Sequence, residues 1–542
     1  MRRTPCNVLL VQPRFSPNSF WNYRETYEAT GARYSAAPLG LVTVAALLPR
    51  DWPARLVDRN TEELRDEDLA WADLVMTGGM LPQQIDTRAV IALAHARGKK
   101  VVVGGPDPTF NPEMYAEADF LVTGEAEDVL AEVVAAWLGG AERGRFAARH
   151  YPDLGRSPIP RFDLIEQRNY LHIGVQLSRG CPYSCEFCNV IELNGRAPRV
   201  KSTEQMLAEL EALLATGYRG HVDFVDDNLI GDRRSVKPFL AALARWNGAH
   251  GRPFEFTTEA SLNLADDPEL LRLMKDANFF AVFIGIESPD PAALEQTHKK
   301  QNLGRDIASS MRKINGAGIF VNAGFIIGFD SETRSVAEAM IACIEQAAIP
   351  VCMVGLLFAL PGTQLARRLA KEGRLHASSH EAAEDDADQC TSGLNFATLR
   401  PRAEILADMR EVYRRIYDPA AYFDRVRRSV RALDVRGHAV RVPLASVWRD
   451  LRSFFRIAWR SGVRDARVRR QFWATLLDGL LHNPRAIKIT VTLAALFLHL
   501  GPFARFLGQR LDRQIAALSP SPAAADRDVE APAVAGAKAV PE

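Results

Sequence analysis

The chain has 542 residues, too many for one hydrophobic core, so we expect about three domains. Its 47% apolar and 25% charged residues describe a soluble globular protein. Seven cysteines are few for this length, and Cys6, Cys343, Cys352 and Cys390 show no paired spacing, so a reducing cytoplasm fits better than a secreted disulfide framework. The net charge of +1 hides an asymmetry, because residues 401–513 hold 23 Lys and Arg against 10 Asp and Glu.

Residues 1–140 alternate short apolar runs with helical patterns. This rhythm predicts an α/β domain with an open parallel sheet of the flavodoxin type, whose ligand lies at the carboxyl ends of the strands. The expected strands are 8–11, 55–57, 74–77, 101–103 and 120–123. The loops that follow them carry Asp58, Gly78, Gly104, Gly105 and Glu125, and the glycines allow a bulky ligand to approach the backbone. A generic doubly wound domain is the alternative.

Residues 141–170 are predicted to be a linker, because Pro152, Pro158 and Pro160 interrupt regular structure. A second alternation of strands and helices follows in residues 171–376. Its six βα units predict a partial (β/α)6 barrel with its chemistry at the carboxyl ends of the strands. The expected strands are 173–177, 222–225, 254–258, 281–286, 318–327 and 351–357.

The first loop of this barrel places Cys181, Cys185 and Cys188 in a C-x3-C-x2-C spacing. Three thiolates on one loop can hold three corners of a 4Fe-4S cluster and leave the fourth iron open to a small molecule. A structural zinc site is one alternative, but it normally needs four ligands, and no fourth Cys or His lies nearby in the sequence. Buried apolar cysteines are the other alternative.

The cysteine loop resembles that of the radical S-adenosylmethionine (SAM) enzymes, in which the open iron binds SAM. The resemblance implies that the three cysteines are the catalytic metal ligands and that Phe187 packs beside the cofactor. By position, polar residues and glycines after the barrel strands resemble the segments that hold the rest of SAM. These residues are Asp226, Asp227, Asn228, Glu259, Ser261, Glu287 and Gly328. For Asp226 and Asp227 the alternative is that they only form hydrogen bonds within their own loops. The basic segments 196–201 and 299–302 are either further contacts or solvated loops.

Directly before such a barrel, residues 1–140 resemble a cobalamin-binding domain. The resemblance rests on segments 38–41, 104–106 and 124–127. The Asp-x-His-x-x-Gly signature that supplies a histidine to cobalt is absent, and His95, the only histidine before position 140, lies in a helical pattern. The resemblance therefore implies cobalamin without a histidine ligand on its lower face.

The C-terminal part begins with a polar, acidic loop at 377–400, and a basic helical domain at 401–516 follows it. Its arginines alternate with aromatic residues, which fits either a helical cap on the barrel or helices lying on an anionic membrane face. The apolar run 489–500 is shorter than the ~20 residues that span a bilayer, so we do not expect a transmembrane helix. No nucleic-acid-binding signature is present. Residues 517–542 read as a disordered tail.

The whole arrangement resembles the B12-binding radical SAM proteins of the type found in hopanoid C-2 methylases and bacteriochlorophyll side-chain methylases. It implies a C-methyltransferase that forms a 5′-deoxyadenosyl radical and transfers a methyl group from methylcobalamin to an unactivated carbon of a lipid or pigment. A hydrophobic small-molecule substrate and an external donor of the flavodoxin or ferredoxin type are the implied partners. A radical rearrangement or ring-forming enzyme and a non-catalytic, membrane-associated iron-sulfur protein are the alternatives.

Overall fold

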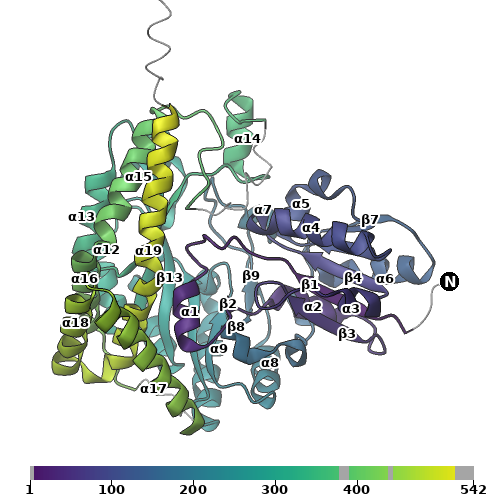
Figure 1. The fold of residues 1–542 in the computed structure, drawn as a ribbon, viewed down its shortest axis with the longest axis horizontal. Helices are drawn as coiled ribbons and strands as arrows, with labels where there is room; N and C mark the ends of the chain where they lie inside the picture. The colour runs from purple at the N-terminus through teal and green to yellow at the C-terminus, as the bar shows by residue number, and fades with distance from the viewer. Residues whose placement is uncertain (1–4, 378–389, 438–443, 519–542) are drawn as a thin grey trace, which may run out of the picture.

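The computed structural model describes residues 5–377, 390–437 and 444–518, without the side chains of 444–447 and 449. Two parallel sheets lie beside each other, and the C-terminal helices cover the second sheet on the side away from the first (Figure 1). Much of the expected acidic loop, at 378–389, and nearly all of the expected tail, at 519–542, lie outside the described residues.

The N-terminal sheet is parallel and has the strand order β3-β1-β4-β5-β6-β7. Its strands are β1 Val8–Gln12, β3 Ala54–Asp58, β4 Leu74–Gly78, β5 Lys100–Gly104, β6 Phe120–Thr123 and β7 Gly144–Ala147. Its helices are α2 Leu39–Leu47, α3 Asp66–Trp71, α4 Gln84–His95, α5 Pro106–Phe110 and α6 Leu130–Leu138. The expected flavodoxin-type sheet is confirmed, with β7 as an additional edge strand.

Both faces of this sheet are buried because helices cover both of them. Along β1, Val8 and Leu10 enter the core on the side of α2 and α6, while Leu9 and Val11 enter the core on the side of α3 and α4. Successive side chains of a strand point to opposite faces, so a continuous apolar run is the pattern that a strand covered twice requires.

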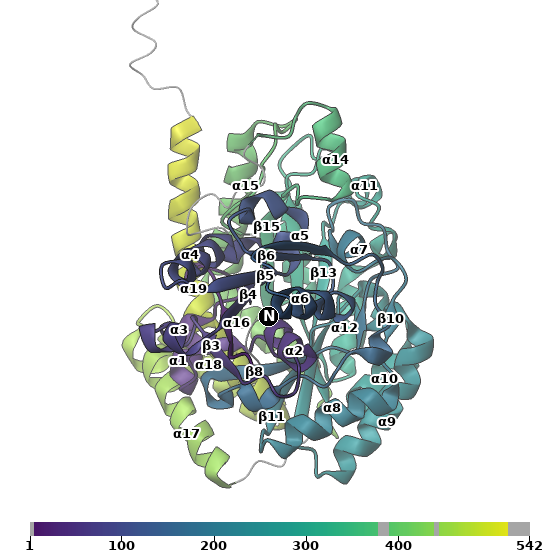
Figure 2. The same cartoon turned by 90° about the vertical axis from the view of Figure 1, so that its right-hand side faces the viewer.

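The second sheet has the order β15-β14-β13-β12-β11-β8-β2 and is also parallel. Its strands are β2 Tyr34–Ala36, β8 Tyr170–Val175, β11 Gly220–Phe224, β12 Phe254–Ala260, β13 Phe279–Glu287, β14 Phe320–Ile327 and β15 Val351–Leu356. The helices between them are α8 Thr203–Ala215, α9 Arg233–Ala249, α10 Pro268–Asp276, α11 Pro291–Gln296, α12 Ile307–Gly316, α13 Ala337–Ala347 and α14 Gln364–Lys371. The partial barrel is thus confirmed, and β2 adds a strand from the segment before α2. In Figure 2 the N-terminal sheet lies in front of the barrel strands.

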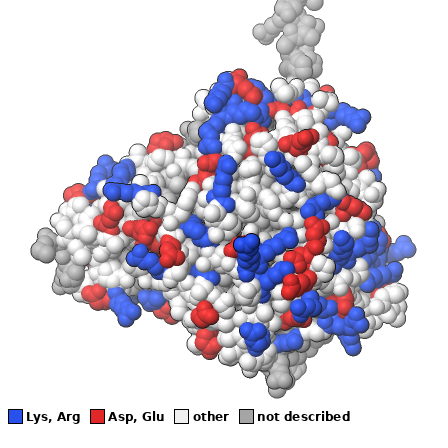
Figure 3. All heavy atoms as spheres, turned by 180° about the vertical axis from the view of Figure 1, so that it is seen from behind, with Lys and Arg blue, Asp and Glu red and all other residues white. Residues whose placement is uncertain are grey.

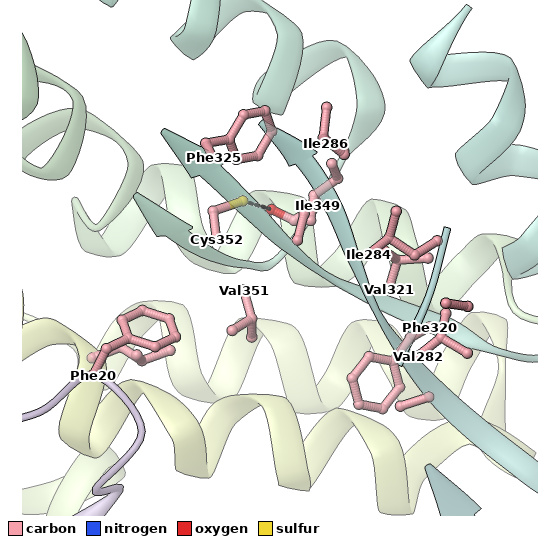
Figure 4. Close-up of a cluster of buried hydrophobic side chains, with 14 of the residues drawn as sticks. Phe20, Val282, Ile284, Ile286, Phe320, Val321, Phe325, Ile349, Val351 and Cys352 are labelled. Atoms are coloured by element: carbon pink, nitrogen blue, oxygen red, sulfur yellow. Dashed lines mark hydrogen bonds between the residues drawn. The ribbon is translucent and has the colours of Figure 1, made fainter. Parts of the chain in front are cut away.

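The C-terminal region is helical, as expected. Its helices are α15 Arg402–Ile416, α16 Pro419–Ala432, α17 Leu444–Trp459, α18 Arg469–His482 and α19 Ile487–Leu518. Figure 4 shows buried side chains of β13, β14 and β15 together with Phe20 of the N-terminal segment, whose ring lies 6.0 Å from that of Phe503 on α19.

The last helix is longer than the apolar run seen in the sequence. The helical segment Pro484–Leu518 has the length and mean hydropathy of a membrane span, but 56% of its most apolar window is buried inside the protein. It packs against α15, α16, α18 and α1 (Arg24–Thr30), as the core helix of a globular protein does.

Candidate active site

A cavity of about 2870 Å³ lies between the two sheets and the C-terminal helices. The loops after β4, β5 and β6 form one side, and the interior faces of the barrel strands form the other. Residues of α17 and α19 also border the cavity. The expected sites of both halves of the chain therefore open into one space.

The cysteine loop leaves β8 and crosses the carboxyl end of the barrel. The backbone N–H of Cys181 donates to Gly195 O at 3.3 Å, and that of Cys188 donates to Cys185 O at 3.2 Å. Cys185 is buried, while Cys181 and Cys188 are half-buried, and Cys188 and Phe187 line the cavity. The loop therefore presents its last cysteine toward the space where a small molecule would bind.

The surroundings of the cysteines fit an anionic cluster. Amide groups face two sulfurs, with Asn228 Nδ2 3.9 Å from Cys181 Sγ and Gln301 Nε2 3.6 Å from Cys185 Sγ. Lys299 lies near Cys185 and Cys188, and its Nζ is 6.0 Å from the ring centre of Phe187. Burial opposes the charge on Lys299, but the carboxylate of Glu287, 2.7 Å away, raises the pKa of Lys299 above its usual range. A fixed cation and amide donors stabilise the negative charge of thiolate-bound iron.

The thiols themselves are disfavoured as free anions. Burial raises the pKa of the Cys181 thiol, and it raises that of Cys188 to about 12. Bound metal removes those protons, so the loop is suited to carry a metal group rather than free thiolates. Among the described residues no three His, Cys, Asp or Glu side chains gather around one point as a single-metal site requires, which gives no support to the zinc alternative.

The two expected aspartates both bind the cysteine loop. Asp226 is 1% exposed and accepts hydrogen bonds from the backbone N–H groups of Leu177 and Ser178 and from the Ser178 hydroxyl. Burial raises the pKa of Asp226 to about 7, although these hydrogen bonds favour its carboxylate. Asp227 lines the cavity and accepts from Gly180 N at 2.8 Å. Both side chains therefore hold the loop, and only Asp227 also reaches the cavity.

The remaining strand-end residues divide in the same way. Glu259 and Glu287 line the cavity, whereas Ser261 bonds to Asn228 and Asn263 behind it. Burial, together with neighbouring carboxylates, raises the pKa of Glu259 to about 8. The φ of Gly328 is 109°, and a Cβ there would lie 2.7 Å from Leu394 Cδ2, so this glycine serves a close packing contact. Glu259 and Glu287 are the carboxylates placed to receive an ammonium or ribose hydroxyls.

In the N-terminal domain, bare backbone faces the cavity at the ends of β4 and β5. A Cβ at Gly78 would lie 1.8 Å from Gly104 O, and Gly105 has φ of 108° with Gly79 N 3.1 Å from its Cβ position. These glycines line the cavity, so a large flat ligand such as a corrin ring can approach the backbone there. Asp58 lies elsewhere, buried against Asn60 and Tyr170. His95 bonds to Asp119 from α4, outside the cavity lining.

Glu125 lines the cavity, and its carboxylate is already bound by two arginines. Its carboxylate pairs with Arg179 at 2.5 Å and with Arg199, and Glu127 pairs with the other nitrogen of Arg179 at 2.8 Å. Arg179 stands two residues before Cys181, so the loop after β6 is tied directly to the cysteine loop. No local pattern predicts this clamp, because its partners are more than fifty residues apart.

Comparisons with known proteins agree with this layout. Residues 29–134 match the B12 binding domain, 175–344 match the Radical SAM superfamily, and 363–513 match a domain of unknown function. The chain is 41% identical to an uncharacterized methyltransferase of Synechocystis over 94% of both chains. It is 34% identical to the hopanoid C-2 methylase of Rhodopseudomonas palustris, over 89% of this chain and 90% of that protein. The cobalamin-dependent radical SAM enzyme OxsB, solved with aqua-cobalamin bound, superposes with a TM-score of 0.59 at 15% identity, covering 94% of this chain and 80% of that one.

Proposed function

Because the chain belongs to the cobalamin-dependent radical SAM methyltransferases, we propose that it methylates an unactivated carbon of a polycyclic lipid of isoprenoid origin. Its cofactors are a 4Fe-4S cluster, SAM and cobalamin, which together supply the radical and the methyl group. The observation that carries the substrate class is the cavity, whose lining continues from the cysteine loop onto the apolar side chains of α19.

The chain's own residues bind and orient the reactants. Cys181, Cys185 and Cys188 hold the cluster, and Glu259 and Glu287 face the space beside it. Gly78, Gly104 and Gly105 line the part of the cavity that receives cobalamin. The barrel and the N-terminal sheet enclose this space from two sides, which limits the access of water to reactive species. Asp226, Asn228, Ser261 and Gly328 support the pocket from behind.

The substrate enters, in this proposal, from a membrane surface against which α17 and α18 lie. Along α17 the exposed side chains Trp448, Leu451, Phe455 and Trp459 recur every three or four residues, and Phe455 and Trp459 are each 62% exposed. Leu477, Leu480 and Leu481 form a similar exposed stripe on α18. Exposed apolar stripes beside arginines are typical of helices that lie in the interface of an anionic bilayer.

The arginines of the C-terminal region separate into two groups. Those of α16 form ion pairs within the chain: the fully buried Arg425 pairs with Glu345, and the half-exposed Arg431 pairs with Asp478. In contrast, Arg464, Arg467 and Arg470 make no ion pair with any described residue. Figure 3 shows Lys and Arg gathered on the helical side of the molecule, with acidic residues among them. The unpaired group supports an anionic surface as the partner, at the cytoplasmic face of the membrane.

A small flavodoxin or ferredoxin is the proposed electron donor. Cys6, Cys343, Cys352 and Cys390 form no disulfide and lie on separate segments, so the described residues offer no second cysteine group for another cluster. The electron therefore comes from outside the chain. We also propose domain boundaries at residues 140, 170, 376, 400 and 516.

The methylation is tested by feeding methyl-deuterated methionine to cells with and without the gene and comparing lipid and pigment extracts by mass spectrometry. We expect a labelled, methylated polycyclic lipid in the parent alone. The Cys181→Ala variant should fold but restore no labelled product. A product that differs in a ring or bond and carries no label would favour the rearrangement or ring-forming alternative. Extracts that do not differ between parent, deletant and Cys181→Ala cells would favour the non-catalytic, membrane-associated iron-sulfur protein.

Membrane contact is tested by sedimentation with phosphatidylglycerol and with phosphatidylcholine vesicles. We expect the protein to sediment with the anionic vesicles and the triple variant Trp448→Ser, Phe455→Ser, Trp459→Ser to remain in solution. Leu399→Ser is the matched control, because Leu399 is also strongly exposed but lies outside α17 and α18. Equal sedimentation of the triple variant and the control would contradict the membrane proposal.

A further inference from the structure

One interior side of the barrel is polar along much of its depth. His172 on β8, His221 and Asp223 on β11, and Thr257 and Glu259 on β12 all line the cavity, and we call these five residues the polar wall. The sheet order places β8, β11 and β12 side by side. Central strands of a parallel barrel are normally apolar on both faces, so a polar face on three neighbouring strands calls for a ligand or a function.

The opposite interior side is mostly apolar, with Asn322 of β14 as a polar exception. Phe280 and Phe283 of β13, Ile326 of β14 and Met353 of β15 line the cavity, and Val491 and Leu496 of α19 line it as well. A ligand lying between these two sides therefore meets hydrogen-bonding groups along one edge and apolar side chains along the other.

Part of the polar wall is internally bonded in a defined direction. The Thr257 hydroxyl donates its one proton to Asp223 Oδ1, and His221 Nε2 lies 2.7 Å from the same hydroxyl oxygen. His221 must therefore donate from Nε2, which leaves Nδ1 as an acceptor. The ring of His221 also lies 4.9 Å from that of His172.

Other groups have no partner. Within the described part of the chain, neither ring nitrogen of His172 nor the carboxyl group of Glu259 makes a hydrogen bond, and Asn322 Oδ1, across the cavity on β14, is buried without one. Burial lowers the pKa of His172, and it lowers that of His221 well below its usual value. The imidazoles are thus neutral, so His172 offers one donor and one acceptor, and His221 offers its remaining acceptor, Nδ1.

The charge of the polar wall selects against anions. The cation at its deep end, Lys488 of α19, already donates to both carboxylate oxygens of Glu255, at 2.7 Å and 2.6 Å. Asp223 and Glu259 would repel a phosphate or carboxylate. Neutral hydroxyl groups, which both donate and accept, match the neutral imidazoles, the threonine and the carboxyl groups.

The depth of the polar wall sets a length for the ligand. Glu255 of β12 pairs with His221 of β11. From Glu255 to Glu259, β12 rises by about 13 Å, at about 3.3 Å per residue. The cysteine loop lies beyond the carboxyl ends of the strands. A molecule with its polar end at His172 and His221 and its other end near the cluster is therefore elongated by at least this much.

We propose that the deep part of the polar wall, His172, His221, Asp223 and Thr257, is a subsite for the neutral, hydroxylated end of an elongated amphiphilic substrate, whose apolar rings lie against Phe280 and Phe283 and whose opposite end presents the carbon to be methylated. The inference rests on the proposed function and specifies its substrate class. It also gives the reaction a fixed direction along the molecule, because only the end remote from the hydroxyl groups reaches the cluster.

The test uses holoenzyme reconstituted without oxygen and two hopanoid probes, one with a polyhydroxylated side chain and one with the matching hydrocarbon side chain. Immobilised protein is equilibrated with each probe in mixed micelles, and retained lipid is quantified by mass spectrometry. We expect at least about tenfold preference for the hydroxylated probe, because unpaired buried polar groups reject the analogue that lacks the hydroxyls. Thr257→Val and, independently, Asp223→Asn should reduce this preference to about twofold or less, while Thr333→Val, an exposed threonine outside the cavity, keeps it.

The outcomes separate the two proposals. Equal retention of both probes by the unaltered enzyme, or full preference in both wall variants, overturns the subsite while the lipid methylase proposal stands. Retention of neither probe above protein-free resin, with the cluster and cobalamin loaded, overturns the polycyclic lipid proposal and the subsite with it. In the expected case the wall variants also raise KM for the hydroxylated probe far more than they change kcat, whereas a general disturbance of the barrel would lower kcat for both probes.

Discussion

Gly180 immediately precedes the first cluster cysteine, and its replacement by alanine tests how the loop is held. Its φ is 97°, and a Cβ there would lie 2.9 Å from Gly195 O, 3.0 Å from Asn194 O and 3.1 Å from Ala197 O. A positive φ costs an L-residue about 1–2 kcal/mol. The crowding against three backbone oxygens adds about 1–3 kcal/mol, because the backbone must move to relieve it. Gly180→Ala should therefore strain the loop by roughly 2–5 kcal/mol.

The matched control is Gly98→Ala, because Gly98 has φ of 67° but no atom within 4 Å of the added Cβ. Gly98 lies outside the cysteine loop, so its backbone strain does not act on the cluster, and the two variants should differ by the whole strain of about 2–5 kcal/mol, or roughly 30- to 4,000-fold in cluster affinity. Iron and acid-labile sulfide retained against a chelator measure this difference, and the melting temperature of each protein shows whether it remains folded. If Gly180→Ala retains iron and sulfide as well as Gly98→Ala does, the steric argument is refuted.

Three further substitutions test charges in other parts of the fold. Arg179→Met removes a cation shared by two carboxylates and should weaken the contact between the N-terminal domain and the barrel by about 3–5 kcal/mol, which would appear as faster proteolysis of the linker. The control, Arg161→Met, breaks an exposed pair and should cost less than about 1 kcal/mol. Equal cleavage rates of the two variants would contradict this prediction. Burial raises the pKa of Glu259 from 4.5 to about 8, so its stabilising contribution is complete below about pH 4.5 and is lost as the pH rises through about 8. The melting temperature of the SAM-free protein should thus fall more between about pH 6 and about pH 9 than that of Glu259→Gln, and parallel curves would disprove the assignment. Arg425→Met leaves the carboxylate of Glu345 and the carbonyl groups of Ile349 and Ile416 without the hydrogen bonds that Arg425 donates. The free energy of unfolding of the C-terminal helices should fall by about 3–5 kcal/mol, measured by denaturant unfolding. An unchanged midpoint would show that the arginine contributes little.

The larger elements of the fold were predictable because burial on both faces gives a strand a continuous apolar run. Within the two large sheets, the two strands that were not expected, β2 and β7, lack that run. β2 is only three residues long, Tyr34-Ser-Ala36, and β7 is an edge strand in which Arg145 is exposed. Neither carries enough apolar surface to mark it, so pairing with a neighbouring strand defines both.

The parts of the candidate site that are formed by residues close together in the sequence were predictable. The cysteine loop and the glycines of the N-terminal loops could be found in this way. The clamp between Glu125 and Arg179 could not, since nothing local marks either partner. The polar wall did leave a signal, because His221 and Asp223 alternate with buried Val222 and Phe224, and a strand covered on both faces has no reason to alternate. Read together with the neighbouring strand β12, that alternation predicts a polar interior face.

Four consecutive residues explain why the two halves of the site keep their relative position. Ser178 binds Asp226, Arg179 binds the loop after β6, and Gly180 N donates to Asp227 before Cys181 enters the cluster site. A shift of the N-terminal domain therefore displaces Arg179 and, through a single peptide unit, the residue next to the first cysteine. Because methyl transfer needs the cobalamin loops and the cluster loop at a fixed separation, the arginine that joins them is as much a positioning residue as the aspartates beneath the loop.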